Sequence, residues 1–260
     1  MNENLASLGY RMPAEWEKQS STWLAWPHNK NDWPDKFENI PSTFAKIASA
    51  LSKVQNVDIL IQSKAVKKNI KRILIKEKTN LNKVNFHIIK TNRVWTRDTG
   101  PIFLVNDLLK KKIMTNFHFN AWAKYKDYNF DNNIKPQIAK IKNIELIDVK
   151  AKIKNKVKDV ILEGGAIDVN GKGTLIATKE CLLSKVQERN PGLSREKLEI
   201  ILSESLNIKN FIWLNKGIVG DDTHGHIDDI TRFFGDDKIF TAMEYQKSDE
   251  NYSALNENLK

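Results

Sequence analysis

Three pairs of short apolar segments, each joined by a polar turn, constrain the fold of this chain most strongly. The pairs are 102–105 with 113–117, 166–169 with 174–178, and 230–234 with 239–242. Asn-Asp, Asn-Gly and Gly-Asp in the turns favour tight hairpins. Asp98, Glu163 and Asp228 precede the three pairs at equal intervals of 65 residues. The even spacing predicts a repeated unit whose equivalent acidic positions meet at one place.

The first hundred residues alternate between helical and strand-like patterns. Apolar residues recur at helical spacing over 44–54 and again over 64–78, and strand-like runs follow at 57–61 and 84–89. Lys and Arg occupy the other face of the second helix, which is typical of a solvated surface. The alternation predicts the α/β class.

A helical stripe is expected at the end of the sequence. Ser248 is a reasonable N-cap, and Tyr252, Leu255 and Leu259 follow at helical spacing. The sequence offers no partner for this stripe before Lys260. We therefore expect the chain to end inside an element.

Composition excludes several functional classes. The chain has 260 residues, of which 40% are hydrophobic and 28% charged, enough for one large or two small domains. No apolar run approaches the roughly 20 residues that span a bilayer, no secretory signal is evident, and one cysteine cannot form an internal disulfide. The net charge of +10 comes nearly all from dispersed Lys residues. We expect a soluble cytoplasmic protein with no membrane association and no specific nucleic-acid partner.

The segment 94–101 contains the first candidate binding residues. Trp95 can form the wall of a pocket, and Asp98 can accept two hydrogen bonds from a planar cation such as guanidinium. The Gly-Pro pair that follows fixes a turn. The alternative is an ordinary loop in which Arg97 and Asp98 form a surface ion pair.

Two further segments carry candidate chemistry. Glu163 precedes two glycines that permit a close backbone approach, but no phosphate-loop pattern follows. In an extended strand, His224, His226 and Asp228 would share one face. This arrangement predicts either a general acid–base beside a carboxylate or a metal site. A polar loop with satisfied histidines is the structural alternative.

The single cysteine, Cys181, stands at a strand end or helix start. A helix N-terminus can lower a thiol pKa and favour a nucleophile. A lone cysteine in such a setting is more often a small buried residue, and this is our expectation for Cys181.

The motifs together resemble those of agmatine deiminases and the related bacterial peptidylarginine-deiminase-type enzymes. The resemblance extends from about residue 9 to the last residue. The matching segments are 12–17, 23–27, 95–101, 119–122, 163–165 and 225–228.

This resemblance implies the pentein fold, an α/β propeller of five ββαβ-type units. The 65-residue interval fits about four such units in 260 residues. We therefore expect residues 1–260 to form a single pentein catalytic domain that lacks its C-terminal unit. An unclosed propeller would expose apolar edges, so a homo-oligomer is expected as well.

The resemblance also implies roles for individual residues, with agmatine as the small-molecule substrate and no cofactor or metal. Asp98 and Asp228 would hold the guanidinium nitrogens, and His226 would protonate departing ammonia and then activate water. Glu163 would orient His226. Trp95 would line the pocket, and Asp222 would receive the distal amine of agmatine. The implied product is N-carbamoylputrescine, on a route to putrescine.

The sequence departs from the family in its nucleophile. The family uses a cysteine near the C-terminus, and Cys181 does not occupy that position. Loss of a nucleophile costs roughly a million-fold in turnover where catalytic residues act as a unit, so we expect this chain to be inactive alone. A smaller departure is Ala123, where the family usually has glycine.

Three alternatives remain open. The first is a peptidylarginine deiminase, which Asp222 and the absence of a signal peptide disfavour. The second is a metal-dependent amidohydrolase that uses His224, His226 and Asp228. The third is a non-catalytic protein that binds guanidinium groups.

Overall fold

The computed structural model describes residues 4–153 and 155–260, and its content confirms the α/β class. The chain divides into two compact units. We call Lys18–Gly100 with Asp127–Gln137 the small unit. The large unit contains the N-terminal residues up to Glu17, Pro101–Lys126 and Ile138–Lys260. The expectation of a single domain stays a prediction.

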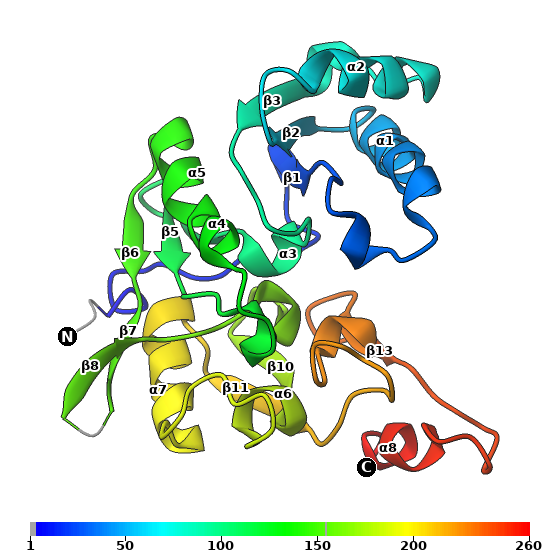
Figure 1. The fold of residues 1–260 in the computed structure, drawn as a ribbon. Helices are drawn as coiled ribbons and strands as arrows, with labels where there is room; N and C mark the ends of the chain where they lie inside the picture. Colours follow the sequence, from blue (N-terminus) through cyan, green and yellow to red (C-terminus); the bar gives the residue numbers. More distant parts are fainter. Residues whose placement is uncertain (1–3, 154) are drawn as a thin grey trace. The chain divides into compact units, whose positions relative to one another are not determined.

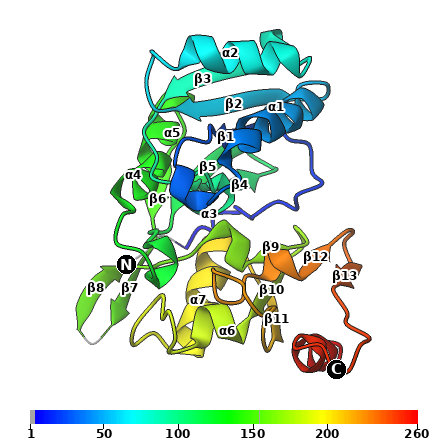
Figure 2. The ribbon, with the colours of Figure 1, turned by 45° about the vertical axis from the view of Figure 1, so that its right-hand side comes forward.

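The small unit is built on a parallel three-stranded sheet in the order β1-β2-β3 (Figure 1). Its strands are β1 (Ser21–Ala25), β2 (Asn56–Ile61) and β3 (Val84–Ile88), and its longer helices are α1 (Ile40–Leu51) and α2 (Lys67–Lys76). Five consecutive residues of the central strand β2 are buried, as expected for a parallel sheet covered by helices. The two helices pack against each other and share the apolar core with the sheet (Figure 2).

Shorter elements complete the small unit. They are η1 (Lys30–Asp32), η2 (Phe37–Asn39), η3 (Leu81–Lys83), α3 (Thr96–Thr99) and α4 (Asn129–Asn132). The predicted strands at 57–61 and 84–89 are thus confirmed to within a residue, and a helix is present within 64–78, although it is shorter than that segment. The helix expected over 44–54 agrees less well, because Val54 lies beyond the end of α1 and is 83% exposed, and Ile47 is 41% exposed.

A ββαβ segment whose hairpin was predicted has its strands in the large unit and its helix divided between the two units. Strands β4 (Ile102–Asn106) and β5 (Lys111–Asn116) pair antiparallel, and β6 (Leu146–Asp148) returns parallel to β5 after α5 (Ile134–Lys142). A second hairpin follows, formed by β7 (Lys150–Ile153) and β8 (Lys156–Asp159).

The same order of elements recurs further along the chain. Strands β9 (Asp168–Val169) and β10 (Thr174–Thr178) pair antiparallel, and β11 (Asn210–Leu214) returns parallel to β10 after α6 (Lys179–Leu183) and α7 (Arg195–Leu206). The Asn170 side chain accepts hydrogen bonds from the backbone of Lys172 and Thr174 and so closes the turn of this hairpin. The expected repeat of ββαβ segments is therefore present twice in the described residues.

A third predicted hairpin, β12 (Thr231–Phe233) with β13 (Ile239–Thr241), is also confirmed, and α8 (Tyr252–Glu257) follows it. Two details of the expected last helix are wrong. Asn251, and not Ser248, is the N-cap residue. Leu255 of the stripe has a partner, because it packs with Ile176 and Ile230 in a small core, whereas Leu259 lies beyond the end of α8 and is 44% exposed.

One turn of the large unit has an unusual backbone. Ala121, Trp122 and Ala123, which form η4 (Ala121–Ala123), have φ angles of 52°, 59° and 53°. Each is in the left-handed region that glycine adopts without steric cost. The Asn120 side chain accepts a hydrogen bond from the Ala123 N–H at 2.9 Å and helps to hold the turn. Ala123 therefore carries a steric cost that glycine would not.

We predict that Ala123→Gly stabilises the large unit by up to about 1 kcal/mol, because it removes the steric cost of a left-handed Cβ. The matched control is Ala254→Gly in α8 of the same unit, which should lose about 1 kcal/mol of helical stability. Urea unfolding measures both changes. A loss of stability in both variants would contradict the proposed strain.

Candidate active site

In the small unit, the structure places Trp95 and Asp98 at the short helix α3. The carbonyl of Trp95 accepts hydrogen bonds from the N–H groups of Asp98 and Thr99, both at 3.0 Å. Trp95 is 44% exposed and its ring centroid lies 5.9 Å from that of Trp33, whereas Asp98 is only 6% exposed. Asp98 is therefore not a surface residue.

A buried carboxylate supports the chain that leads to this helix. Asp131 accepts hydrogen bonds from the backbone N–H groups of Asn92 and Arg93 at 2.7 and 3.2 Å. Arg93 in turn donates to the carboxylate of Asp127 at 3.0 Å and lies 3.9 Å from Asp32. Burial raises the pKa of Asp131 and that of Asp32 to about 6 each, against the opposing effect of Arg93.

In the large unit, Glu163 is fully buried and paired with a buried arginine. It precedes η5 (Gly164–Ala166), and its Oε1 accepts a hydrogen bond from Arg189 Nε at 3.0 Å. Arg189 also donates to the backbone carbonyls of Gln187 and Thr223. The guanidinium group therefore connects three separate segments of the large unit.

A second carboxylate shapes the loop that carries His226. Asp221 accepts hydrogen bonds from the hydroxyl and N–H of Thr223 and from the N–H groups of Gly225 and His226. Burial alone would raise the pKa of Asp221, but these four hydrogen bonds hold that pKa below its usual value. The loop is therefore fixed around a charged carboxylate.

The segment 224–228 is not an extended strand, so the condition under which His224, His226 and Asp228 would share one face is not met. His224 has a φ of 65°, and η6 (Ile227–Asp229) begins directly after His226. The hydrogen bonds to Asp221 satisfy backbone groups that a strand would have paired, so the segment turns instead. His226 is 3% exposed, and its Nδ1 lies 3.7 Å from Asp228 Oδ1.

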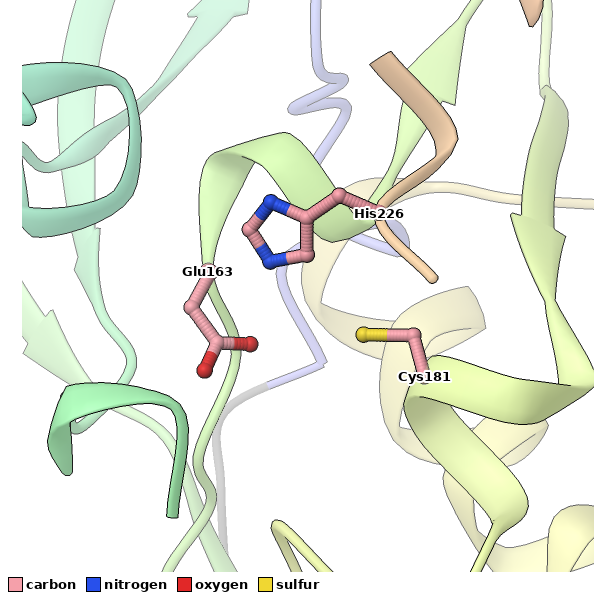
Figure 3. A group of neighbouring side chains, drawn as sticks. All are labelled: Glu163, Cys181 and His226. Atoms are coloured by element: carbon pink, nitrogen blue, oxygen red, sulfur yellow. The ribbon is translucent and has the colours of Figure 1, made fainter. Parts of the chain in front are cut away.

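Three buried side chains from distant segments converge in the large unit. Glu163, Cys181 and His226 each contribute one polar atom, and these atoms lie within 4.8 Å of one another (Figure 3). The structure thus brings Glu163 and His226 together. Cys181 is 1% exposed, which confirms the expectation of a small buried residue. Its place beside two candidate site residues was not expected.

Asp222 lies elsewhere in the same unit, on a partly exposed surface. It forms an ion pair with Lys124 and accepts a hydrogen bond from the Tyr125 hydroxyl at 2.8 Å. Partial burial would raise the pKa of Asp222, but these two donors hold that pKa below its usual value. Its carboxylate is therefore charged and already holds an ammonium group.

Comparison with known proteins adds family information to this geometry. Residues 11–260 match the model of the Porphyromonas-type peptidyl-arginine deiminase family. The chain is 32% identical over 250 residues to the agmatine deiminase of Ectopseudomonas mendocina and 30% identical over 259 residues to that of Pseudomonas syringae pv. tomato. These alignments include 94% and 97% of this chain but only 63% and 65% of the two relatives.

Solved structures show the same likeness. An agmatine deiminase of Enterococcus faecalis superposes with a TM-score of 0.85 at 28% identity, over 99% of this chain and 67% of that one. A cysteine-to-serine variant of the C. jejuni agmatine deiminase with substrate bound superposes with a TM-score of 0.81 at 29% identity. That alignment covers 96% of this chain and 69% of the other.

We predict that Arg189→Met destabilises the large unit by about 3–5 kcal/mol, because it leaves the Glu163 carboxylate buried without its partner. The matched control is Arg195→Met, which breaks the partly exposed pair with Glu199 and should cost less than about 1 kcal/mol. Chemical unfolding measures both. Equal losses would mean that Arg189 contributes no more than a surface ion pair.

We also predict that the small unit becomes more stable as the pH falls from 7 to 5. The folded pKa of Asp131, about 6, lies above its ordinary value of 3.8, so the folded state binds the proton first. The gain from Asp131 is about 1 kcal/mol, and it is lost again as the pH rises through 6. Thermal unfolding should show that Asp131→Asn lacks this gain. In the double variant Asp131→Asn with Asp32→Asn, stability should depend on pH even less. An unchanged pH profile in the double variant would contradict the assignment.

Proposed function

Since the chain belongs to the Porphyromonas-type peptidyl-arginine deiminase family, we propose that it belongs to an agmatine deiminase that converts agmatine and water to N-carbamoylputrescine and ammonia. The observation that best supports this is the buried meeting of Glu163 and His226, which come from two separate family motifs. A carboxylate beside an imidazole suits a group that must donate a proton and later accept one.

The proposed mechanism needs a cysteine thiolate and two proton transfers. The thiolate attacks the guanidinium carbon, the carbon–nitrogen bond breaks, and His226 gives its proton to the departing ammonia. His226 then takes a proton from water, and the resulting hydroxide attacks the same carbon. The carbon–sulfur bond breaks to release the thiolate, and the hydroxyl proton is lost to solvent as the carbonyl group of the product forms. Glu163 orients His226 throughout. The family's cysteine position does not correspond to Cys181, so we do not propose Cys181 as the nucleophile.

Binding of the cation is proposed to fall to carboxylates and one aromatic ring. Asp98 and Asp228 hold the guanidinium nitrogens, and Trp95 lines the pocket. The burial of Asp98 and the exposed ring of Trp95 are compatible with these roles. The 3.7 Å separation between His226 and Asp228 supports placing the guanidinium carbon close to the imidazole.

Asp222 is proposed to select agmatine over peptidyl-arginine by holding the distal ammonium group. Its ion pair with Lys124 supports this, because the carboxylate and the Tyr125 hydroxyl already form an environment that accepts an ammonium. A peptidyl substrate has no free amine at this distance from its guanidinium group.

The wider architecture and setting are also proposals. Two ββαβ segments and a third hairpin favour a pentein propeller, of which this chain would supply about four of five units. No helix in the described residues is long and apolar enough to cross a membrane. We propose a cytoplasmic location and self-association as a homo-oligomer, with no nucleic-acid partner.

Affinity for two ligands tests the substrate proposal. Agmatine and butylguanidine share the guanidinium group and chain length, but only agmatine has the distal amine. We predict that the chain binds agmatine about tenfold more tightly, because its distal ammonium can replace the partly exposed Lys124 at Asp222, whereas butylguanidine makes no contact there. Asp222→Asn should remove this difference, and Asp237→Asn, at an exposed turn position, should keep it. Calorimetry gives both affinities.

Equal affinity of the unaltered chain for the two ligands would contradict the role of Asp222. Preferential binding of an internal-arginine peptide would favour the peptidylarginine deiminase instead. Ammonia release from agmatine in the same samples tests the expectation of inactivity, and turnover abolished by His226→Gln would overturn that expectation while supporting the proposed mechanism. Agmatine binding without turnover would support the binding role.

A further inference from the structure

We infer that Glu163, Cys181 and His226 form a binding site for a single borderline-soft divalent cation, of which Zn²⁺ is the best fit. Their three polar atoms lie within 4.8 Å of one another and all three residues are buried. Figure 3 shows the carboxylate, the thiol and the imidazole directed toward a common space. The sequence had suggested a different set, with His224 and Asp228 in place of Glu163 and Cys181.

The chemistry of the three donors selects the ion. Thiolate, imidazole and carboxylate are all common ligands of Zn²⁺, whereas Mg²⁺ and Ca²⁺ require oxygen ligands. A tetrahedral zinc ion places its ligand atoms about 3.3–3.7 Å apart. The observed spread of up to 4.8 Å therefore requires a contraction of about 1 Å when the ion binds.

A second observation points to a ligand at this position. Glu163 Oε1 is held by Arg189, but Oε2 is buried and has no hydrogen-bond partner among the residues that the structure describes. An unsatisfied buried carboxylate oxygen is costly, and a cation would satisfy it. Because Arg189 fixes the other oxygen, Oε2 is oriented before any ion arrives.

The other two donors are supported in a way that is usual at metal sites. The Thr178 hydroxyl accepts a hydrogen bond from the Cys181 N–H at 3.0 Å and caps α6. Asp221 holds the backbone N–H of His226 at 3.0 Å. Asp228 Oδ1 lies 3.7 Å from Nδ1, which leaves Nε2 as the nitrogen available to the ion.

The charges allow binding with loss of one proton. The Cys181 thiol gives its proton to the solvent, a sulfur–metal bond forms, and no oxidant or reductant is needed. The bound ion, the two anionic ligands and Arg189 then carry a net charge of +1. Binding should therefore strengthen as the pH rises.

An ion at this site would occupy the imidazole that the proposed function uses as acid and base. This consequence, unlike the binding itself, rests on the proposed function. Zinc would then act as an inhibitor, because it would bind the imidazole of His226 and prevent its proton transfers. It would not compete with the substrate's amine for Asp222. The site would connect the activity of the enzyme to the availability of free zinc.

Cobalt absorption tests the site without any activity measurement. We expect the reduced chain to bind one equivalent of Co²⁺ with a thiolate-to-cobalt charge-transfer band, and Zn²⁺ to displace it. Cys181→Ser should lose the band, and His226→Gln and Glu163→Gln should weaken binding by about 100-fold or more. His224→Asn is the matched control, because His224 contacts Ser184 and lies outside the three ligands, so it should bind as the unaltered chain does.

Thiol reactivity provides a second measurement if a variant does not fold. Cys181 is the chain's single cysteine, so alkylation reports this site alone. Zn²⁺ should slow alkylation of the unaltered chain and of His224→Asn by about tenfold or more, but not that of Glu163→Gln. Cobalt binding without a thiolate band, or zinc protection that survives Glu163→Gln, would overturn the proposal. Failure of agmatine binding with an intact cobalt site would contradict only the proposed function.

Discussion

The buried guanidinium group of Arg189 is the interaction on which the candidate site depends. It holds the Glu163 carboxylate and two backbone carbonyls, and so connects the segment before η5, the loop after α6 and the loop that carries His226. Removing two charges from water is costly, and a close pair with further hydrogen bonds offsets most of that cost. The pair contributes mainly by holding its acceptors in place. A planar guanidinium can bind several acceptors at once in fixed directions, which the single ammonium group of lysine cannot do.

Regular elements could be predicted from the sequence because their causes are local. Alternating apolar residues and turn-forming dipeptides determined the three predicted hairpins, and an apolar run flanked by amphipathic helices determined the β2 core. The turn at His224–Asp228 could not be predicted, for the opposite reason. Asp221 captures nearby N–H groups through its side chain, and this local competition turns the backbone away from extended structure.

The supporting residues of the site could not be found by pattern because their partners are distant in sequence. Arg189 and Glu163 are 26 residues apart, and Asp131 reaches back 39 residues to Asn92. The sequence did contain one indication of these supporting residues, which is its use of arginine. Only seven of the 42 basic residues are arginine, and four of these, Arg11, Arg93, Arg189 and Arg232, form ion pairs with acidic residues distant in the sequence or partly buried. In a Lys-rich chain, arginine marks places where geometry matters.

Because Asp222 is already paired with Lys124, a cation that binds this carboxylate has to take the place of the Lys124 ammonium group. Such a cation replaces one ammonium group with another, and the released Lys124 returns to solvent. The number of ion pairs is conserved, so screening by salt weakens the reactant and the product of the exchange alike. Affinity at this position is therefore buffered against ionic strength, and discrimination between amines depends on shape and hydrogen bonding more than on charge.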